Sequence, residues 1–427
     1  MSRRISSLHL AAILVVSFSG VASAAPPGPS TAETLVGRYI VVFNNAVTDP
    51  AAAANDLTRA HGLGVLHHYE HALRGFAATI PDGRLAAVQA DPRVLYVSAD
   101  RPVWAIAQTL PTGVDRIEGD NSSTHSGDGS GSVNVAVAII DTGIDIDHPD
   151  LNVVGGVNCS SGRSYDDGNG HGSHVAGTVA SKDDAAGAVG MAPGAPLYAV
   201  RVLNNTGSGS WANVICGVDW VTANAATLGI KVANMSLGGS GSDPTGAGCS
   251  TGVALHDAIC NSVAAGVTYV VAAGNSNVNF KDSVPAAYDE VLTVTAMADF
   301  NGASGGGASS TCRSDVDDTA ADFSNFTTVG SSDESHTIAA PGVCIYSAWK
   351  RAGYNTISGT SMASPHVAGT VALCIGSGGC AGLTPSQIIS KLRSDAAAQP
   401  SSYGFTDDPD SPNGSRYYGY LVHAGGY

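Results

Sequence analysis

Charged side chains are scarce in this chain of 427 residues: Asp, Glu, Lys and Arg make up 13%, against about 25% in an average soluble protein. Basic residues are the rarer kind, with 20 Lys plus Arg against 36 Asp plus Glu, and they form no cluster interleaved with aromatic residues. A protein that binds nucleic acid needs such a cluster to displace the counterions of the phosphates. The composition therefore argues against a nucleic-acid partner.

Long apolar runs are also missing. After the N-terminus, no segment reaches the roughly 18 apolar residues that a bilayer-spanning helix needs. Residues 1–24 have the order of an export signal, with Arg3 and Arg4 first, an apolar stretch from 8 to 20, and small residues ending at Ala24. A short membrane anchor is the alternative. We expect a secreted, extracellular product with no membrane segment in its mature form.

No cysteine precedes Cys159, and the pattern Cys-x-x-Cys does not occur. The eight cysteines form an even set in an exported chain, which favours disulfides over a zinc cluster. They can pair in roughly a hundred ways, so the sequence leaves the connectivity open. Cys249 with Cys260 and Cys374 with Cys380 are the nearest neighbours along the chain.

The chain divides into a short first part, residues 25–107, and a long second part, residues 108–427. Within the first part, residues 38–103 predict the order β-α-β-β-α-β, which is the ferredoxin-like α+β plan. The expected strands are 39–43, 65–69, 75–80 and 94–97, and the expected helices are 50–61 and 83–90.

The second part alternates short apolar strands with Ala-rich helices between about residues 130 and 395. This alternation predicts an α/β fold with three layers, a parallel sheet with helices on both faces. The expected strands are 133–140, 197–202, 232–235, 267–272 and 291–294, and two expected helices are 211–226 and 252–265. Residues 299–320 are expected to form a surface loop, and the chain after 395 an irregular tail.

Three segments each carry a side chain that can act in catalysis, at the end of a predicted strand or the start of a predicted helix. A predicted buried strand ends at Asp141, and parallel sheets place their sites at that end. His171 lies where a Gly-rich turn gives way to a small-residue helix, and Ser361 lies in a helical first turn, whose free N–H groups stabilise an oxyanion. Taken singly, Asp141 fits a turn residue, Ser361 an N-cap, and His171 either a structural histidine or half of a metal pair with His174.

Taken together and in this chain order, the three segments resemble the subtilisin-like serine proteases (subtilases, peptidase family S8), and more closely their proteinase K-like branch. The resemblance covers about residues 130–380, and the preceding unit resembles the family's inhibitory propeptide of the I9 type. It implies that Ser361 is the nucleophile, that His171 is the general base, and that Asp141 orients the histidine.

The resemblance also implies the rest of the site. Asn275 follows a buried strand and would donate, with the Ser361 backbone, to the oxyanion of the intermediate. Two segments would bind an extended polypeptide substrate with broad specificity and an apolar residue before the scissile bond: Gly207, Ser208, Gly209 and Trp211, and Ser236, Leu237, Gly238 and Gly239. For Trp211 alone, a core aromatic is the alternative.

Catalysis of this type needs no cofactor, but relatives often bind structural Ca²⁺. Asp150 stands at one position used for this purpose, whereas Thr337 stands where the proteinase K-like branch commonly has a calcium-binding aspartate. The resemblance further implies a monomeric zymogen that is inhibited by its own propeptide and cleaves itself near residues 105–108.

Two other functions fit parts of the sequence. Gly302–Gly306 matches Gly-x-Ser-x-Gly, the motif of an esterase or lipase, although a Gly- and Ser-rich loop follows it rather than a helix. A catalytically inactive subtilase that serves as a binding module is the second alternative.

Overall fold

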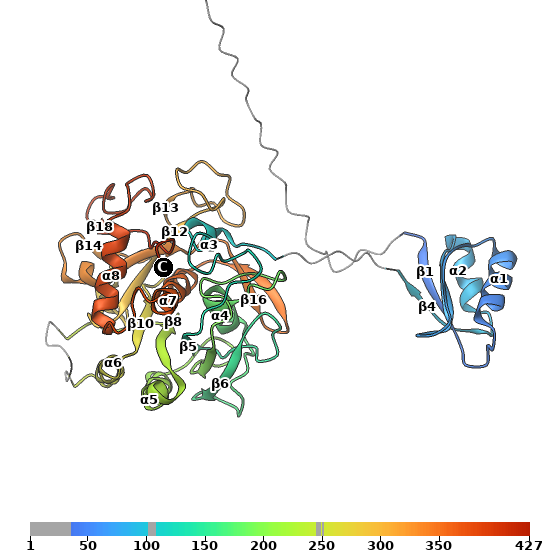
Figure 1. Ribbon diagram of the computed structural model, residues 1–427, viewed down its shortest axis with the longest axis horizontal. Helices are drawn as coiled ribbons and strands as arrows, with labels where there is room; N and C mark the ends of the chain where they lie inside the picture. Colours follow the sequence, from blue (N-terminus) through green and yellow to red (C-terminus); the bar gives the residue numbers. More distant parts are fainter. Residues whose placement is uncertain (1–35, 101–107, 245–248, 250–251) are drawn as a thin grey trace, which may run out of the picture. The chain divides into compact units, whose positions relative to one another are not determined.

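The computed structural model describes residues 36–100, 108–244, 249 and 252–427. The chain divides into two compact units between Ala105 and Ile106 (Figure 1). The predicted export signal at 1–24 and, apart from Gln108, the predicted cleavage segment lie outside the described residues. Among the helices of the described residues, none combines the length and the apolar character that crossing a membrane requires.

The first unit is an antiparallel sheet with two helices, in the order that the sequence predicts. Its elements are β1 (Arg38–Phe43), α1 (Pro50–His61), β2 (Gly64–Tyr69), β3 (Gly75–Thr79), α2 (Asp82–Gln89) and β4 (Val94–Ala99). The strand order β2-β3-β1-β4 is the ferredoxin-like one. Helix α1 begins where Asp49 accepts a hydrogen bond from the Ala52 N–H, and it ends at Gly62, whose φ of 63° is left-handed.

The second unit is built on an eight-stranded sheet, which is parallel except at one edge. Its path runs β13-β12-β10-β8-β5-β7-β6, and β15 pairs in parallel with β12. The strands are β5 (Ala136–Asp141), β6 (Val153–Asn158), β7 (Leu197–Arg201), β8 (Ile230–Met235), β10 (Thr268–Ala272), β12 (Leu292–Ala298), β13 (Thr319–Ala320) and β15 (Thr337–Pro341).

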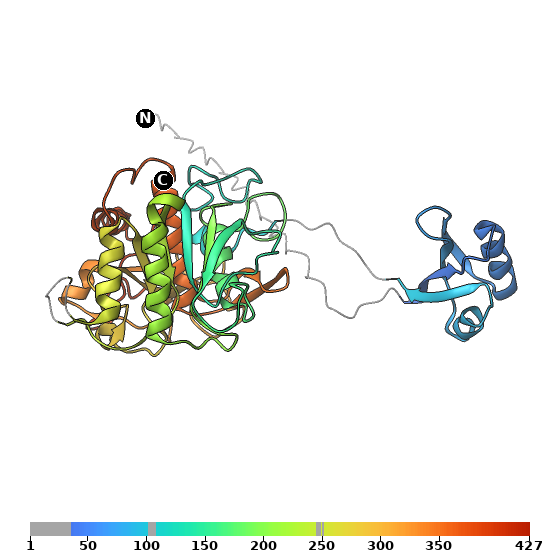
Figure 2. The same ribbon diagram turned by 90° about the horizontal axis from the view of Figure 1, so that it is seen from below.

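Helices cover both faces of this sheet. Helices α4 (His171–Ala180), α7 (Thr360–Gly376) and α8 (Pro385–Ala397) share one core with Val137, Ile139 and Val270. Helices α5 (Trp211–Leu228) and α6 (Ala254–Ala264) share the other core with Ala138 and Ile140, and Figure 2 shows them side by side in green and yellow. Successive strand residues face opposite cores, so the predicted three-layer α/β architecture is confirmed.

Smaller elements surround the three layers. They are α3 (Thr112–Arg116), β9 (Gly239–Ser240), η1 (Phe280–Asp282), β11 (Ser283–Val284), β14 (Thr327–Thr328), η2 (Ser332–His336), β16 (Ile345–Trp349), β17 (Gly353–Ile357) and β18 (Arg416–Tyr417).

The sheet differs from the prediction at its edges. Strand β6 was not expected, because its sequence VVGGVN contains two glycines, which have low strand propensity. The edge strand β13 runs antiparallel to β12, so the sheet is not purely parallel. The irregular C-terminal segment is packed rather than loose, since Tyr403, Leu421 and Val422 belong to the core around α7.

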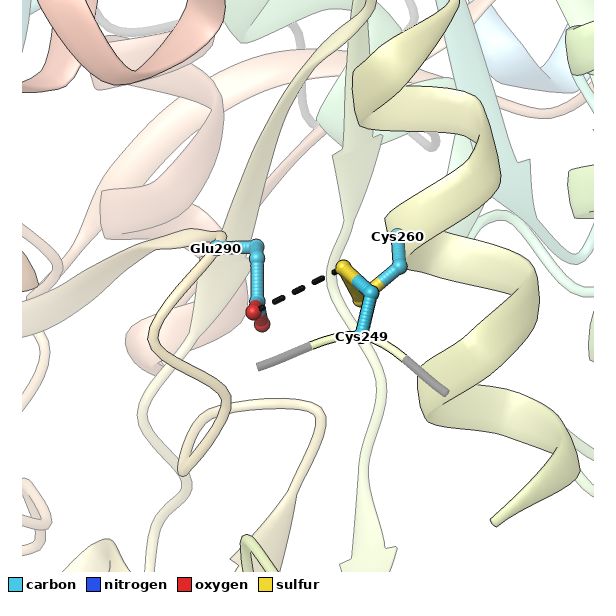
Figure 3. Close-up of side chains that lie close together, drawn as sticks. All are labelled: Cys249, Cys260 and Glu290. Carbon is cyan, nitrogen blue, oxygen red and sulfur yellow. Dashed lines mark hydrogen bonds between the residues drawn. A yellow bond between two sulfur atoms is a disulfide. The ribbon is translucent and has the colours of Figure 1, made fainter. Parts of the chain in front are cut away.

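All eight cysteines of the second unit are paired, as Cys159–Cys216, Cys249–Cys260, Cys312–Cys344 and Cys374–Cys380. Figure 3 shows Cys249 bonded to Cys260 of α6, with Glu290 Oε1 3.8 Å from Cys249 Sγ. Both sulfurs are consumed by this bond, so the pair offers no thiolate to a metal ion. The structure thus supplies the connectivity that the sequence left open.

Candidate active site

The polar residues singled out in the sequence meet at one edge of the central sheet. Strands β5, β8 and β10 are neighbours, and their carboxyl ends lead into Asp141, Ser236 and Asn275 respectively. Helices α4 and α7 pack against each other. His171 is the first residue of α4, and Ser361 is the second residue of α7, directly after Thr360. Parallel strands thereby bring side chains from distant parts of the chain to a single edge.

Asp141 and His171 form a hydrogen-bonded pair. The distance from Asp141 Oδ1 to His171 Nδ1 is 2.8 Å, and the Asp141 side chain is fully buried while that of His171 is 26% exposed. Burial lowers the pKa of His171, but the charge and hydrogen bond of Asp141, helped by Asp167, raise it more, so the net shift is upward. With Nδ1 bound to the carboxylate, Nε2 is the nitrogen left to exchange a proton with a substrate group.

A dense set of hydrogen bonds fixes the turn that carries His171. Asp167 Oδ1 accepts from the Gly170 N–H and from Thr142 Oγ1, and Asp167 Oδ2 accepts from the Ser173 N–H and Oγ at 2.9 and 2.7 Å. Gly170 has a φ of 113°, and a Cβ there would lie 2.3 Å from the Trp349 ring. Only glycine fits this position, and α4 therefore starts in one orientation.

Ser361 is tied to the end of β8. Its Oγ donates to the Ser236 carbonyl at 3.3 Å, and Ser236 Oγ donates to the Ser361 carbonyl at 2.8 Å. Among the described residues, no hydrogen bond joins Ser361 Oγ to His171. A serine hydroxyl can turn among its staggered rotamers, and such contacts often tighten only when substrate is bound.

The amide of Asn275 is held by the first residue of α7. Its Oδ1 accepts from the Thr360 N–H at 2.8 Å and from Thr360 Oγ1 at 2.9 Å. Both acceptor directions of the amide oxygen are therefore used, which fixes Nδ2 as the free donor. Within the part of the chain that the structure describes, Nδ2 makes no hydrogen bond, and Asn275 and Ser361 line the same pocket.

Two pockets meet beside these groups. The first, of about 690 Å³, is lined by His171 and by all eight residues expected to bind substrate: Gly207, Ser208, Gly209, Trp211, Ser236, Leu237, Gly238 and Gly239. The second, of about 360 Å³, is lined by Ser361 and Asn275 and shares Leu237, Gly238 and Gly239 with the first. A continuous groove thus runs past the reactive groups.

Sequence reasoning missed the residues that hold these groups in place. Asp167 stands three residues before Gly170, the N-cap of α4, and the run Asp-Gly-Asn-Gly was a detectable capping signal. Thr360 lacked such a signal, because its role depends on Asn275, which is distant in sequence. His174 is not a metal ligand with His171: it is buried, and its Nε2 contacts the Ile345 carbonyl at 2.9 Å.

Asp150 is a buried carboxylate. Its Oδ2 accepts from the Ala188 N–H at 3.1 Å and from the Tyr354 OH at 3.2 Å, and its Oδ1 has no hydrogen-bond partner among the described residues. Burial raises the pKa of Asp150. Ca²⁺ needs about six to eight oxygen ligands, whereas these contacts are hydrogen-bond donors. Oδ2 thus has a structural role in the described residues, and the calcium site expected at Asp150 stays a prediction.

The esterase motif does not have the required local structure. An esterase nucleophile stands in a sharp turn between a strand and a helix. Gly302–Gly306 instead lies in the loop between β12 and β13, and Ser304 is exposed there. The esterase alternative is therefore wrong, because its motif does not lie between a strand and a helix.

Comparison with known proteins assigns both units to families. The model of the subtilase family matches residues 132–420, and that of peptidase inhibitor I9 matches residues 38–105. Subtilisin DY of Bacillus licheniformis is 40% identical over 294 residues, which cover 68% of this chain and 92% of that protein. Subtilisin E of Bacillus subtilis (strain 168) is 35% identical over 372 residues, 86% of each chain.

A solved structure agrees with these sequence matches. The crystal structure of a cold adapted subtilisin-like serine proteinase superimposes with a TM-score of 0.54 and 31% sequence identity, over 73% of this chain and 97% of that one. The narrower resemblance to the proteinase K-like branch stays a prediction. An Asp–His pair at the edge of a parallel sheet, the two family matches and this structural likeness lead to one conclusion: the chain belongs to the subtilase family and is a subtilisin-like serine endopeptidase with an I9-type inhibitor domain.

Proposed function

We propose that this protein is a secreted zymogen whose active site is the triad of Asp141, His171 and Ser361. The observation that carries the proposal is the 2.8 Å hydrogen bond between Asp141 Oδ1 and His171 Nδ1, in a pocket that adjoins the one lined by Ser361. A serine hydroxyl is a weak nucleophile until a base takes its proton, and the pair supplies that base.

In the proposed reaction, Ser361 Oγ attacks the scissile carbonyl while His171 Nε2 takes its proton. Asp141 stabilises the imidazolium that forms. Asn275 Nδ2 and the Ser361 N–H donate to the new oxyanion, which collapses as His171 returns the proton to the leaving amine. Water then repeats the sequence on the acyl-enzyme. Each step is an addition to a carbonyl, an elimination of the amine or of Ser361 Oγ, or a proton transfer, so the chemistry requires no cofactor.

The groove is suited to an extended peptide. Backbone groups at Gly207–Gly209 and Ser236–Gly239 would pair with the substrate main chain, which gives broad specificity. The second pocket has apolar side chains in its wall, including Ala272, Val284 and Ala286, beside Ser361. We therefore expect an apolar residue before the scissile bond.

The remaining chain fits synthesis as an inactive precursor. We propose that residues 1–24 direct export, that residues 25–107 form the propeptide, and that residues 108–427 form the mature enzyme, which acts as a monomer. Similarity of residues 38–105 to peptidase inhibitor I9 supports inhibition by the propeptide. Similarity to subtilisins and to an extracellular serine proteinase of Thermus sp. (strain Rt41A), 38% identical over 397 residues, supports secretion.

The test uses the purified protein, its Ser361→Ala variant, casein and a short-chain ester, each with and without a sulfonyl fluoride. We expect casein cleavage that the reagent abolishes and that Ser361→Ala lacks. Ester cleavage without proteolysis would indicate an esterase, and no reaction with either substrate would indicate an inactive subtilase that serves as a binding module. Casein is the deciding substrate, since subtilases also cleave activated esters.

A further inference from the structure

A cluster of two acids and a histidine lies outside the proposed active site. Asp289 stands between β11 and β12, and Asp333 and His336 belong to η2. One ligand atom from each of these three residues lies within 4.8 Å of the other two. We refer to Asp289, Asp333 and His336 as the 289–336 cluster.

His336 is the unusual member of the 289–336 cluster. It is 1% exposed, and neither of its ring nitrogens has a hydrogen-bond partner among the described residues. A neutral imidazole nitrogen is the commonest metal ligand in proteins. A buried imidazole normally satisfies both nitrogens, so this ring has unused bonding capacity.

One nitrogen of the His336 ring lies close to the carboxylate of Asp289. His336 Nε2 lies 3.7 Å from Asp289 Oδ1, which is too long for a hydrogen bond. Two ligand atoms bound to the same tetrahedral metal ion, each about 2.0–2.2 Å from the ion, lie about 3.4 Å apart. The observed separation is therefore close to that of two ligands of one metal ion.

The two acids differ in exposure and in hydrogen bonding. Asp333 is held, because its Oδ2 accepts from Thr327 Oγ1 at 3.0 Å. The side chain of Asp289 is 46% exposed, so it can shift toward an ion and leaves a path for the ion to enter. A hydrogen bond to a ligand carboxylate, like the one from Thr327 to Asp333, commonly orients a metal ligand.

The charge around the cluster favours a cation. Three other carboxylates, those of Asp243, Glu290 and Asp333, lie close enough to Asp289 to interact with it electrostatically. Arg393 is the basic group that acts on His336. Several carboxylates thus crowd one small region, and their repulsion would be relieved by a divalent ion.

We propose that Asp289, Asp333 and His336 bind a divalent transition-metal ion, with zinc the best match. Imidazole nitrogen and carboxylate oxygen both bind zinc, and three protein ligands with water in the fourth position complete a tetrahedral zinc site. Calcium prefers a cage of oxygen ligands and is disfavoured by the nitrogen. Thr337, at the expected calcium position, instead donates its Oγ1 to the Asp333 carbonyl at 2.6 Å.

Such an ion would link two segments that border the catalytic unit's sheet and groove. Residue 289 follows β11, and Ser283, Val284 and Ala286 of that region line the pocket of Ser361. His336 leads directly into β15, which pairs with β12. The expected effect is stabilisation of the fold on that side, and it does not depend on the proposed catalytic mechanism.

The experiment uses the full chain without an affinity tag and with Ser361→Ala, which removes self-digestion as a variable. Co²⁺ is titrated as a spectroscopic substitute for Zn²⁺ and followed by visible absorption, and thermal melts are recorded with and without Zn²⁺. Asp289→Asn removes one ligand charge at an exposed position and should fold normally. His336→Gln removes the nitrogen donor, and Asp282→Asn, at an exposed neighbouring acid, is the matched control.

We expect a saturable Co²⁺ band and a Zn²⁺-dependent rise in Tm. Asp289→Asn and His336→Gln should weaken binding at least about tenfold, since even the loss of an outer-shell contact costs about 10–100-fold. Asp282→Asn should leave it unchanged. The proposal fails if the parent shows no Co²⁺ band, if Asp289→Asn binds as the parent does, or if millimolar Ca²⁺ displaces Co²⁺.

Discussion

At the residue scale, the behaviour of His171 depends on Asp141. In the proposed mechanism His171 is the general base, which must be neutral to accept a proton, so activity should rise as the pH rises through the pKa of His171. Because Asp141 and Asp167 together raise the pKa of His171 more than burial lowers it, the rise should be centred at a higher pH than for an ordinary histidine. Asp141→Asn removes the charge and should move the rise to lower pH while lowering kcat by about 10⁴-fold.

The measurement is kcat/KM against pH for a fluorogenic peptide, for the parent and for Asp141→Asn. Asp147→Asn, at an exposed acid close in sequence, serves as the control for a general change in surface charge. If the rise in kcat/KM with pH stays in place or moves to higher pH in Asp141→Asn, Asp141 is not the group that raises the pKa of His171.

Asn275 should contribute through its free amide N–H. Asn275→Leu keeps a similar volume and removes the donor, and kcat should fall by about 10²–10³-fold, the loss found when a subtilisin loses one oxyanion donor. Thr360→Val removes one of the two hydrogen bonds that orient Asn275, so kcat should fall by about tenfold or less. Steady-state kinetics should show KM nearly constant in both; a loss confined to KM would place Asn275 in ground-state binding instead.

At the scale of elements, the start of α4 depends on Gly170. Gly170→Ala would combine a φ of 113° with a Cβ 2.3 Å from Trp349, so we expect a loss of about 3 kcal/mol or more in the free energy of unfolding. Gly194→Ala is the matched control, because its φ of 65° is also left-handed but no atom lies within 4 Å of the added Cβ. It should lose only about 1–2 kcal/mol.

Urea denaturation of both variants in the Ser361→Ala background would give these values. Equal losses for the two variants would show that backbone strain alone matters and that the packing of Trp349 against Gly170 contributes little.

The elements themselves show where sequence reasoning succeeds. Helix α1 was predicted at its observed bounds, because Asp49, Pro50 and Gly62 give local start and stop signals. Strand β6 and the hairpin of β16 and β17 were not predicted, because their strand structure depends on pairing with neighbours rather than on local propensity.

At the scale of the whole molecule, the disulfides should contribute according to the chain they enclose. Cys159–Cys216 spans 57 residues and Cys374–Cys380 spans 6. If loop closure in the unfolded chain dominates, replacing the first pair by alanine should lower the free energy of unfolding by about 4 kcal/mol and the second by about 2 kcal/mol. Urea denaturation would measure both; a larger loss at the buried 374–380 pair would show that packing outweighs chain entropy.

Self-processing belongs to the same scale. The Ser361→Ala precursor should keep its first unit, whereas the parent should lose it and begin near residues 105–108. Intact-mass analysis after expression in a protease-deficient host would measure this, and added active enzyme would show whether the variant can still be cut by another molecule. Normal cleavage of Ser361→Ala in the absence of other proteases would contradict self-processing.

The sequence by itself determined the order of elements in the first unit and the alternation of strands and helices that yields a three-layer α/β fold, because both depend on local periodicity. The proposed reactive residues were indicated by their resemblance to a known family. Only the tertiary structure decided the disulfide partners, the anchoring of Asn275 by Thr360, and the approach of Asp289 to His336. These features join residues far apart along the chain, and their distances are set by how strands and helices pack rather than by any signal within one segment.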